Sequence, residues 1–413
     1  MPVDNLAVRR PQFSTWLTAT NDLTSRFVSA ARIPDLINFA GGLPALETFP
    51  TDALAALAKE LTLQYPQDCL GYGPTDGLPE LRDAIADRFT SPILCLSREN
   101  VLITTGGTQS LDLLGKVLIE PGEVIAAEFP TYVGAMDAWR PRQPQYREIV
   151  FDAGCSDLAS AFAGAKLIYT VPNFSNPSGK FLDLPTREEI VAAAHVTGIW
   201  LVEDDPYGAL QYDGPPLARL IDLSAHRSPG AIYDGPVVYM GSFSKELAPG
   251  LRVAWIIAAP EMIRALKAAK QGADLCSPGL NQRIGLAAMQ HGLVDEMRPR
   301  LITLYRERRD ALCAAMERHL SDMFVWDVPI GGMFVWATID GSRIDTDRLL
   351  AAGMDEGVLV GPSSVFFPSD GNNAAIRLNF TFNPVERIEE GVRRLARAVR
   401  AVQRSSAESG EVR

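Results

Sequence analysis

Cysteine and histidine are both scarce in this chain of 413 residues. The five cysteines are scattered, odd in number and free of C-x-x-C spacing, so neither a disulfide framework nor a zinc site is expected. The four histidines also show no nucleophile or metal-ligand spacing and are interpreted as structural: His195, His226, His291 and His319. The sequence therefore predicts reduced thiols and no metal.

Long hydrophobic runs are also absent. No stretch of about 18 apolar residues without charge occurs, so no membrane span is predicted. The N-terminus lacks the basic start and apolar run of a signal peptide, which makes the cytoplasm the expected location. The net charge of −11 disfavours nucleic acid as a partner, because phosphate backbones demand clustered Lys and Arg. Small molecules are the expected partners.

Short apolar or β-branched runs recur between residue 100 and about residue 260. They are predicted to be buried strands at Val101–Thr104, Val124–Ala127, Leu167–Thr170, Ile199–Val202, Val237–Met240 and Ala254–Ile257. Helical patterns lie between most of them. This alternation predicts an α/β fold, with a mostly parallel sheet covered by helices on both faces. In such sheets ligands bind beyond the carboxyl ends of the strands.

The length of the chain predicts one large and one smaller domain. After about residue 290 the pattern changes to that of an α+β domain, with a helix at Asp295–Leu320, strands at Met333–Ala337 and Ala375–Phe380, and a closing helix at Val385–Val402. We expect the large domain at residues 46–290 and the small domain at 291–403. Residues 1–45 are expected to pack with the small domain, and the polar tail at 404–413 to be disordered.

Four polar segments follow predicted strands. Thr104–Gln109 contains two glycines and opens a helix, which suits an anion such as phosphate, although such a turn alone is more often a plain connection. Asn173–Gly179 holds an amide beside an Asn-Pro step, which alone is more often an ordinary turn. Glu203–Tyr207 places carboxylates after a very apolar strand, where a protonated ring nitrogen, a metal or an arginine could compensate one of them.

The fourth segment, Gly241–Lys245, is followed by Arg252. Hydroxyls and a guanidinium suit a phosphate monoester. Lysine is rare in this chain, and an amine that is partly desolvated among cations becomes nucleophilic, which suits a Schiff base. A lone lysine is usually a surface group, but the order of the four segments, each after a strand, is far more specific than any one of them.

These segments resemble the fold-type I pyridoxal-phosphate (PLP) aminotransferases of class I/II. The resemblance spans nearly the whole chain and is strongest to the branch that holds 2-aminoadipate and kynurenine aminotransferases. Its motifs are F-A-G-G-L-P (Phe39–Pro44), Y-x-P-T-x-G (Tyr72–Gly77), V-P-N-F-x-N-P-x-G (Val171–Gly179), S-F-S-K-x-L-A-P-G-L-R (Ser242–Arg252), P-x-G-G-M-F-x-W (Pro329–Trp336) and I-R-L-N-F (Ile376–Phe380).

The resemblance implies catalytic roles for Lys245, Asp204 and Tyr207. Lys245 would carry the cofactor as a Schiff base and move the proton between the substrate α-carbon and C4′ of the cofactor. Asp204 would pair with the pyridinium nitrogen and keep it protonated. Tyr207 and Asn176 would hydrogen-bond the phenolate oxygen, and Tyr132 would stack on the ring.

The implied phosphate ligands are Gly107, Thr108, Gln109, Ser242, Ser244 and Arg252. Tyr72 would reach the phosphate in the neighbouring subunit, so the site would require a homodimer. Arg377 would clamp the substrate α-carboxylate in a bidentate fork beside Asn176, and Gly42 would close over the substrate.

The implied reaction moves the amino group of an L-amino acid, aromatic or 2-aminoadipate-like, to a 2-oxo acid such as 2-oxoglutarate in a ping-pong cycle. Departures from the branch at Ser175, Glu246 and Ala254-Trp255 put the inherited substrate range in doubt. The segment Gly361–Pro368, with Phe366 and Phe367, hints at a large or aromatic substrate, although such aromatics are as often core residues.

Two alternative functions are compatible with this sequence. The same site could serve a lyase, racemase or oxidase. The domain could also be a non-catalytic effector sensor of the GntR type, but only about 35 residues precede the F-A-G-G motif, without a basic recognition helix.

Overall fold

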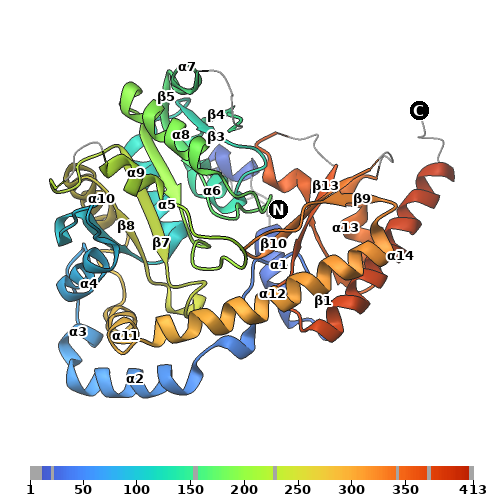
Figure 1. Ribbon diagram of the computed structural model, residues 1–413, viewed down its shortest axis with the longest axis horizontal. Helices are drawn as coiled ribbons and strands as arrows, with labels where there is room; N and C mark the ends of the chain where they lie inside the picture. The colour runs from blue at the N-terminus through green and yellow to red at the C-terminus, as the bar shows by residue number, and fades with distance from the viewer. Residues whose placement is uncertain are drawn as a thin grey trace, which may run out of the picture.

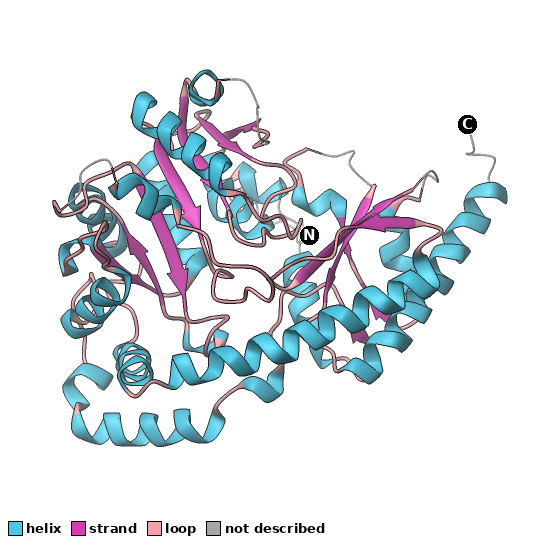
Figure 2. Ribbon diagram, in the orientation of Figure 1, coloured by secondary structure: helices cyan, strands magenta, loops and turns pink. Residues whose placement is uncertain are grey.

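The structure is a computed structural model that describes residues 12–19, 23–151, 157–226, 230–340, 344–369 and 374–408. It has a large domain around a seven-stranded sheet and a smaller domain around a four-stranded sheet (Figures 1 and 2). The predicted α/β class is confirmed. The exact domain bounds stay a prediction.

The large sheet is mostly parallel. In spatial order its strands are β2 (Val101–Thr104), β8 (Ala254–Ile257), β7 (Val237–Ser242), β6 (Trp200–Asp204), β5 (Ala165–Thr170), β3 (Val124–Ala127) and β4 (Gln145–Glu148). Strand β8 runs antiparallel to both of its neighbours, and all other pairs are parallel. The carboxyl ends of β5, β6 and β7 therefore meet at one edge.

Both faces of this sheet are buried except at its edge strand β4, which explains why the other strands read as continuous apolar runs. Leu102, Val202 and Ile256 belong to one hydrophobic cluster, whereas their neighbours Leu201 and Ile257 belong to another on the opposite face. The helices of the domain are α2 (Thr51–Gln64), α3 (Pro66–Leu70), α4 (Pro79–Phe89), α5 (Gly107–Leu118), α6 (Val133–Trp139), α7 (Leu158–Phe162), α8 (Leu184–Thr197), α9 (Leu220–Ala225), α10 (Pro260–Gln271) and α11 (Gly279–Gln290).

The long helix α12 (Leu293–Leu320) runs from the large domain along the small one (Figure 1). The small sheet is antiparallel and contains β12 (Gly361–Pro362), β13 (Ala375–Asn379), β10 (Phe334–Ile339) and β9 (Phe324–Trp326). Helices α13 (Thr346–Asp355) and α14 (Val385–Glu408) complete this domain. The closing helix thus continues past residue 404, where the disordered tail was expected to begin; residues 409–413 lie outside the described part.

The N-terminal segment joins the small domain through a short parallel sheet. Strand β1 (Ile37–Asn38) pairs with β11 (Val358–Leu359), and helix α1 (Leu23–Ser29) precedes it. The Asn38 side chain donates to the backbone oxygen of Phe27 at 2.7 Å, which fixes α1 relative to the strand. Of the described helices, none has the length and apolarity needed to cross a membrane.

Candidate active site

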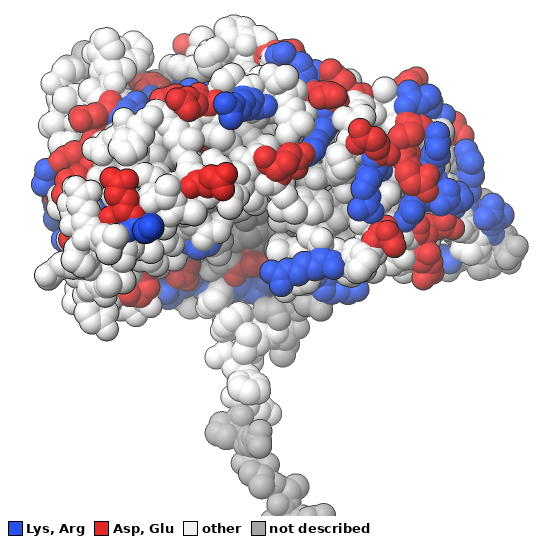
Figure 3. Space-filling model, turned by 90° about the horizontal axis from the view of Figure 1, so that it is seen from below, with Lys and Arg blue, Asp and Glu red and all other residues white. Residues whose placement is uncertain are grey.

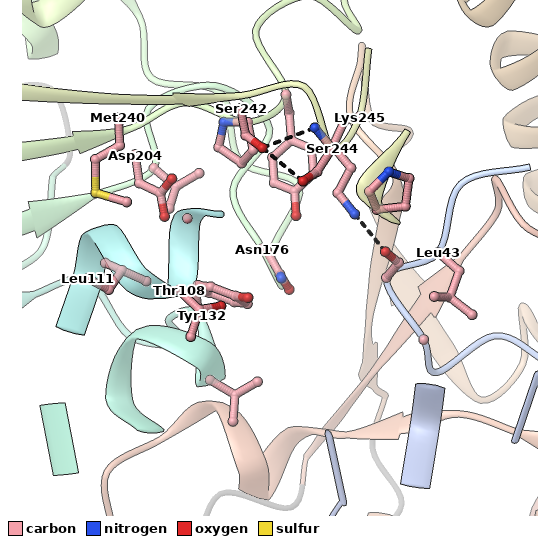
Figure 4. A pocket seen from close by; sticks show the side chains of 18 of the residues that line it. Leu43, Thr108, Leu111, Tyr132, Asn176, Asp204, Met240, Ser242, Ser244 and Lys245 are labelled. Carbon is pink, nitrogen blue, oxygen red and sulfur yellow. Dashed lines mark hydrogen bonds between the residues drawn. The ribbon is translucent and has the colours of Figure 1, made fainter. Parts of the chain in front are cut away.

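A cavity of about 240 Å³ lies at the carboxyl ends of the large-sheet strands, and residues of the small domain and of the N-terminal segment close it. Figure 4 shows side chains from these separate elements converging on it. Most of the expected site residues line it: Gly42, Gly107, Thr108, Tyr132, Asn176, Asp204, Tyr207, Ser242, Ser244, Lys245, Arg252 and Arg377. Gln109 and Tyr72 are not part of this lining.

Lys245 follows β7, and its Nζ points into the cavity and donates to the backbone oxygen of Gly42 at 2.8 Å (Figure 4). Burial lowers the pKa of Lys245 from its usual 10.5 to about 8, and the positive charges of Arg377 and Arg252 act in the same direction. The unprotonated, nucleophilic form of this amine is therefore far more populated close to neutral pH than in an ordinary lysine, although the protonated form still predominates below about pH 8.

Asp204 is the last residue of β6, and its Oδ2 accepts a hydrogen bond from the Tyr169 hydroxyl of the neighbouring strand at 2.7 Å. Burial raises the pKa of Asp204 to about 7, and the charge of Asp205 adds to this, while the bond from Tyr169 opposes it. No lysine or arginine pairs with Asp204 within the described ranges. A buried carboxylate of this kind fits a cationic ligand atom.

The neighbouring carboxylates point elsewhere. Glu203 lies on the opposite face of β6 and accepts from the backbone N–H groups of Leu220 and Ile221, at 2.8 and 2.9 Å, at the start of α9. Asp205 accepts from the side chain of Asn173 at 2.9 Å. No group of three or more potential metal ligands occurs in the described part of the chain.

One end of the cavity is built for an anion. Helix α5 begins at Gly107, so its free N–H groups face the cavity. Gly106 precedes it with a φ of 87°, and a Cβ there would collide with the Arg252 guanidinium. On the other side the Ser242 and Ser244 hydroxyls lie 2.8 Å apart. Hydroxyls, helix amides and an arginine together match a phosphate group.

The side chain of Gln109 contacts groups behind the phosphate-binding end, and its expected role as a phosphate ligand stays a prediction. Its Oε1 accepts from the backbone N–H of Thr105 at 2.7 Å, and its Nε2 donates to Asp274 at 2.7 Å. Through these two hydrogen bonds the side chain supports the loop at Thr105 and does not face the cavity. Tyr72 is 88% exposed, so its contact with a neighbouring subunit stays a prediction.

Arg377 projects from β13, and its Nη1 donates to Oδ1 of Asn176 at 2.6 Å, while its Nη2 donates to the backbone oxygen of Ala40. The guanidinium is sandwiched between the rings of Phe334 and Phe366, 4.4 and 4.7 Å from their centroids. Burial lowers the pKa of Arg377 to about 10, and its Nε has no hydrogen-bond partner. An oriented, incompletely satisfied guanidinium suits a substrate carboxylate.

A partly buried tyrosine, Tyr132, and a buried one, Tyr207, complete the wall. Tyr132 directly precedes α6, and Gly134 leaves room for its ring, because a Cβ at that glycine would meet the ring itself. Burial raises the pKa of both Tyr132 and Tyr207, so both keep their hydroxyl proton. These hydroxyls can donate hydrogen bonds to a ligand oxygen.

The departures noted in the sequence lie away from the cavity. Glu246 forms ion pairs with Arg88 and Arg298, at 2.8 and 3.5 Å, that join α4 and α12 to this loop. Trp255 packs edge-on against Phe243, 5.0 Å between centroids. Neither residue lines the cavity, so neither limits the substrate by direct contact.

The aromatic pair of the small domain also lies outside the lining. The Phe366 ring packs against the Arg377 guanidinium. The Phe367 ring stacks on the Phe129 ring, with 6.4 Å between their centroids. The lining also includes residues that were not expected, among them Phe27 and Val28 of α1. The only signal for them was their place shortly before the F-A-G-G motif.

Comparison with known proteins agrees with this geometry. Residues 34–395 match the family model "Aminotransferase class I and II". The chain is 37% identical to the aromatic-amino-acid aminotransferase 1 of Thermococcus litoralis, over 89% of this chain and 88% of that one. It is 36% identical to the 2-aminoadipate transaminase of Thermus thermophilus, over 89% and 91% of the two chains.

A solved structure is also similar. The α-aminoadipate aminotransferase from Thermus thermophilus, complexed with N-(5′-phosphopyridoxyl)-L-leucine, superposes with a TM-score of 0.83 at 32% identity and covers 94% of this chain and 99% of its own. The chain therefore belongs to the class I and II aminotransferases. It is a PLP-dependent aminotransferase, and the anion-binding end, the buried amine and the buried carboxylate of the cavity fit this cofactor.

Proposed function

We propose that this enzyme moves the amino group of an L-amino acid to a 2-oxo acid such as 2-oxoglutarate in a ping-pong cycle centred on Lys245. The observation that carries the proposal is the lowered pKa of Lys245 in a cavity shared with Asp204 and Arg377. Such an amine can both bond to an aldehyde and transfer a proton.

Different residues of the cavity bind the substrate and transfer the proton. Arg377 and Asn176 hold the substrate α-carboxylate, which leaves the amino group and the α-hydrogen on the side of Lys245. Lys245 would take the proton from the α-carbon and return it at C4′ of the cofactor, on the other side of the amino nitrogen. Bound PLP supplies an electron-withdrawing ring that stabilises the negative charge on the α-carbon.

Other residues keep the ring in the right state and place. Asp204 would hold a proton on the ring nitrogen by charge pairing, which would also compensate its own buried charge. Tyr207 and Asn176 would donate hydrogen bonds to the ring oxygen, and Tyr132 would lie against the ring. Thr108, Ser242, Ser244 and Arg252, with the N–H groups at Gly107, hold the phosphate.

We further propose a donor with an uncharged, apolar side chain. The charged side chains of the cavity wall are those of Asp204, Lys245, Arg252 and Arg377, and each already has a role. The remaining wall is largely apolar and includes Phe27, Val28, Leu43 and Val133. This wall gives an aromatic side chain more apolar contact than the side chain of 2-aminoadipate, so it favours an aromatic donor, as in the name of the Thermococcus relative.

Substitution of Val28 tests the donor class. Wild-type enzyme should show a higher kcat/KM for phenylalanine, tyrosine and leucine than for 2-aminoadipate. Val28→Arg adds a cation at the half-open wall and should shift this ratio towards 2-aminoadipate, whereas Val28→Leu should not. A wild-type preference for 2-aminoadipate would show the proposed donor class to be wrong.

We also propose a homodimer in the cytoplasm. Leu63, Leu70 and Tyr72 around α2 and α3 are 75%, 74% and 88% exposed, an apolar surface suited to a partner. In the view from below, charged residues crowd the small-domain end at the right, while the large-domain side shows broad uncharged areas (Figure 3). Light scattering of the purified enzyme tests the dimer.

The proposed location rests on the cysteines. Four of them are free thiols, which fits a reducing compartment: Cys69, Cys95, Cys276 and Cys313.

The reaction class is tested by product analysis with a donor and 2-oxoglutarate. Transamination requires one glutamate and one new 2-oxo acid for each donor consumed. Ammonia or carbon dioxide in place of glutamate would indicate an oxidase or a lyase, and a D-amino acid would indicate a racemase. Cofactor binding without any turnover would indicate that the protein is a non-catalytic, effector-sensing domain.

A further inference from the structure

Asp274, which is not part of the cavity lining, lies behind the phosphate-binding end of the cavity. Its Oδ2 accepts from the Thr105 hydroxyl at 2.9 Å and from Nε2 of Gln109 at 2.7 Å. Its Oδ1 accepts from Nζ of Lys270 at 2.7 Å. One carboxylate thus binds three side chains from two segments of the chain.

Two of these partners flank the turn that faces the phosphate. Thr105 precedes Gly106, and Gln109 follows Thr108 in the first turn of α5. The pair is also linked directly, because the backbone N–H of Thr105 donates to Oε1 of Gln109 at 2.7 Å. Asp274 therefore closes a ring of hydrogen bonds around the residues that present their N–H groups to the cavity.

The charge of Asp274 is balanced locally. The Lys270 side chain is fully buried, and its amine pairs with the carboxylate. Burial alone would raise the pKa of Asp274, but the hydrogen bonds from Lys270, Gln109 and Thr105 lower it overall, so the carboxylate stays ionised. An unbalanced negative charge here would repel a phosphate, whereas the ion pair supplies strong hydrogen-bond acceptors at little net charge.

We propose that Asp274 is a positioning residue for the cofactor phosphate: with Lys270 as its counterion, it holds Thr105 and Gln109 so that the N–H groups of Gly106–Thr108 converge on the phosphate. The inference rests on the proposed cofactor site and assigns it a support that acts through the loop. It predicts a loss of affinity for the phosphate group in particular, because the rest of the cofactor contacts other elements.

The test compares two ligands that differ only in the phosphate. PLP and pyridoxal are titrated into cofactor-free wild-type, Asp274→Asn and Asp274→Ala protein, with binding followed by absorbance. Both variants should bind PLP about tenfold or more weakly, the loss expected when hydrogen bonds to a charged group are removed. Their affinity for pyridoxal should stay at the wild-type value, as should kcat at saturating PLP.

Asp112→Asn is the matched control, because Asp112 forms a comparable ion pair with Lys116 at 2.6 Å on the outer side of the same helix. It should bind both ligands like the wild type. If Asp274→Asn does not fold, Gln109→Ala serves instead, because it removes the hydrogen bonds of Gln109 to Asp274 and Thr105. It should likewise weaken the binding of PLP but not that of pyridoxal.

Unchanged PLP affinity in the variants, or an equal loss for PLP and pyridoxal, would overturn the inference. A wild-type protein that binds neither ligand would instead refute the cofactor site itself. The two failures are therefore distinguishable.

Discussion

The Arg377 guanidinium and the Asn176 side chain meet between the two domains, with 2.6 Å from Nη1 to Oδ1. Asn176 follows β5 of the large sheet, while Arg377 belongs to β13 of the small one, 201 residues away in sequence. The contact therefore orients the group that is proposed to receive the α-carboxylate, and it couples that group to the relative position of the domains.

Arg377→Lys should lower kcat/KM about 30-fold or more for every amino acid and 2-oxo acid, because a lysine cannot reproduce the planar, two-point contact. The loss should be similar for aromatic and aliphatic donors, since all share the α-carboxylate. Steady-state kinetics with several donors measures this. A loss confined to one donor would place Arg377 at the substrate side chain instead.

The lowered pKa of Lys245 predicts a pH dependence for cofactor capture by the cofactor-free protein. Below about pH 8 the amine is protonated and cannot attack, so the rate should rise about tenfold per pH unit and level off above about 8. Arg377→Met removes a nearby positive charge and should move the profile to higher pH. A rate that still rises towards pH 10.5, the usual pKa of lysine, would contradict the lowered value.

Asp204→Asn should reduce kcat about 100-fold or more at saturating cofactor, because an amide cannot keep the ring nitrogen protonated. Tyr169→Phe removes only the hydrogen bond to Asp204 and should cause a much smaller loss. Single-turnover kinetics with a fixed donor compares the two. Equal activity of Asp204→Asn and the wild type would exclude the proposed pairing.

Gly106→Ala should weaken PLP binding as well as lower stability. Its φ of 87° disfavours any side chain, and the added Cβ would also displace Arg252. Gly122→Ala is a matched control, because Gly122 has a φ of 86° but open space around it. Both variants should lose about 1 kcal/mol or more of unfolding free energy from backbone strain, but only Gly106→Ala should lose PLP affinity. Equal PLP affinity in both variants would contradict the role of this turn.

The sequence was informative about the buried strands and poor at the edges. Runs such as Val101–Thr104 and Ala254–Ile257 were predicted at their observed bounds, because residues buried on both faces leave a continuous apolar signal. Strand β4 was missed because its residues, Gln145–Glu148, are polar and partly exposed at the sheet edge. The antiparallel direction of β8 was also missed, since an apolar run reads alike in either direction.

The site was predictable where its residues follow strands, because the topology brings those strand ends together. Asp204 and Lys245 are of this kind. Side-chain direction was not predictable: Gln109 stands beside the phosphate-type residues in sequence, yet it binds Asp274. Phe27 reaches the cavity only because Asn38 and the β1–β11 pairing fix the N-terminal segment, a long-range contact that no local pattern records.

The most direct measurement is the absorbance spectrum of the purified enzyme between about 300 and 550 nm, recorded before and after addition of phenylalanine without any oxo acid. The band of the lysine-bound cofactor should disappear, a pyridoxamine phosphate band should replace it, and 2-oxoglutarate should restore the first spectrum. The Lys245→Ala variant should lack the first band. A spectrum that amino acids leave unchanged, or a wild-type protein without a cofactor band even after added PLP, would contradict amino-group transfer through Lys245.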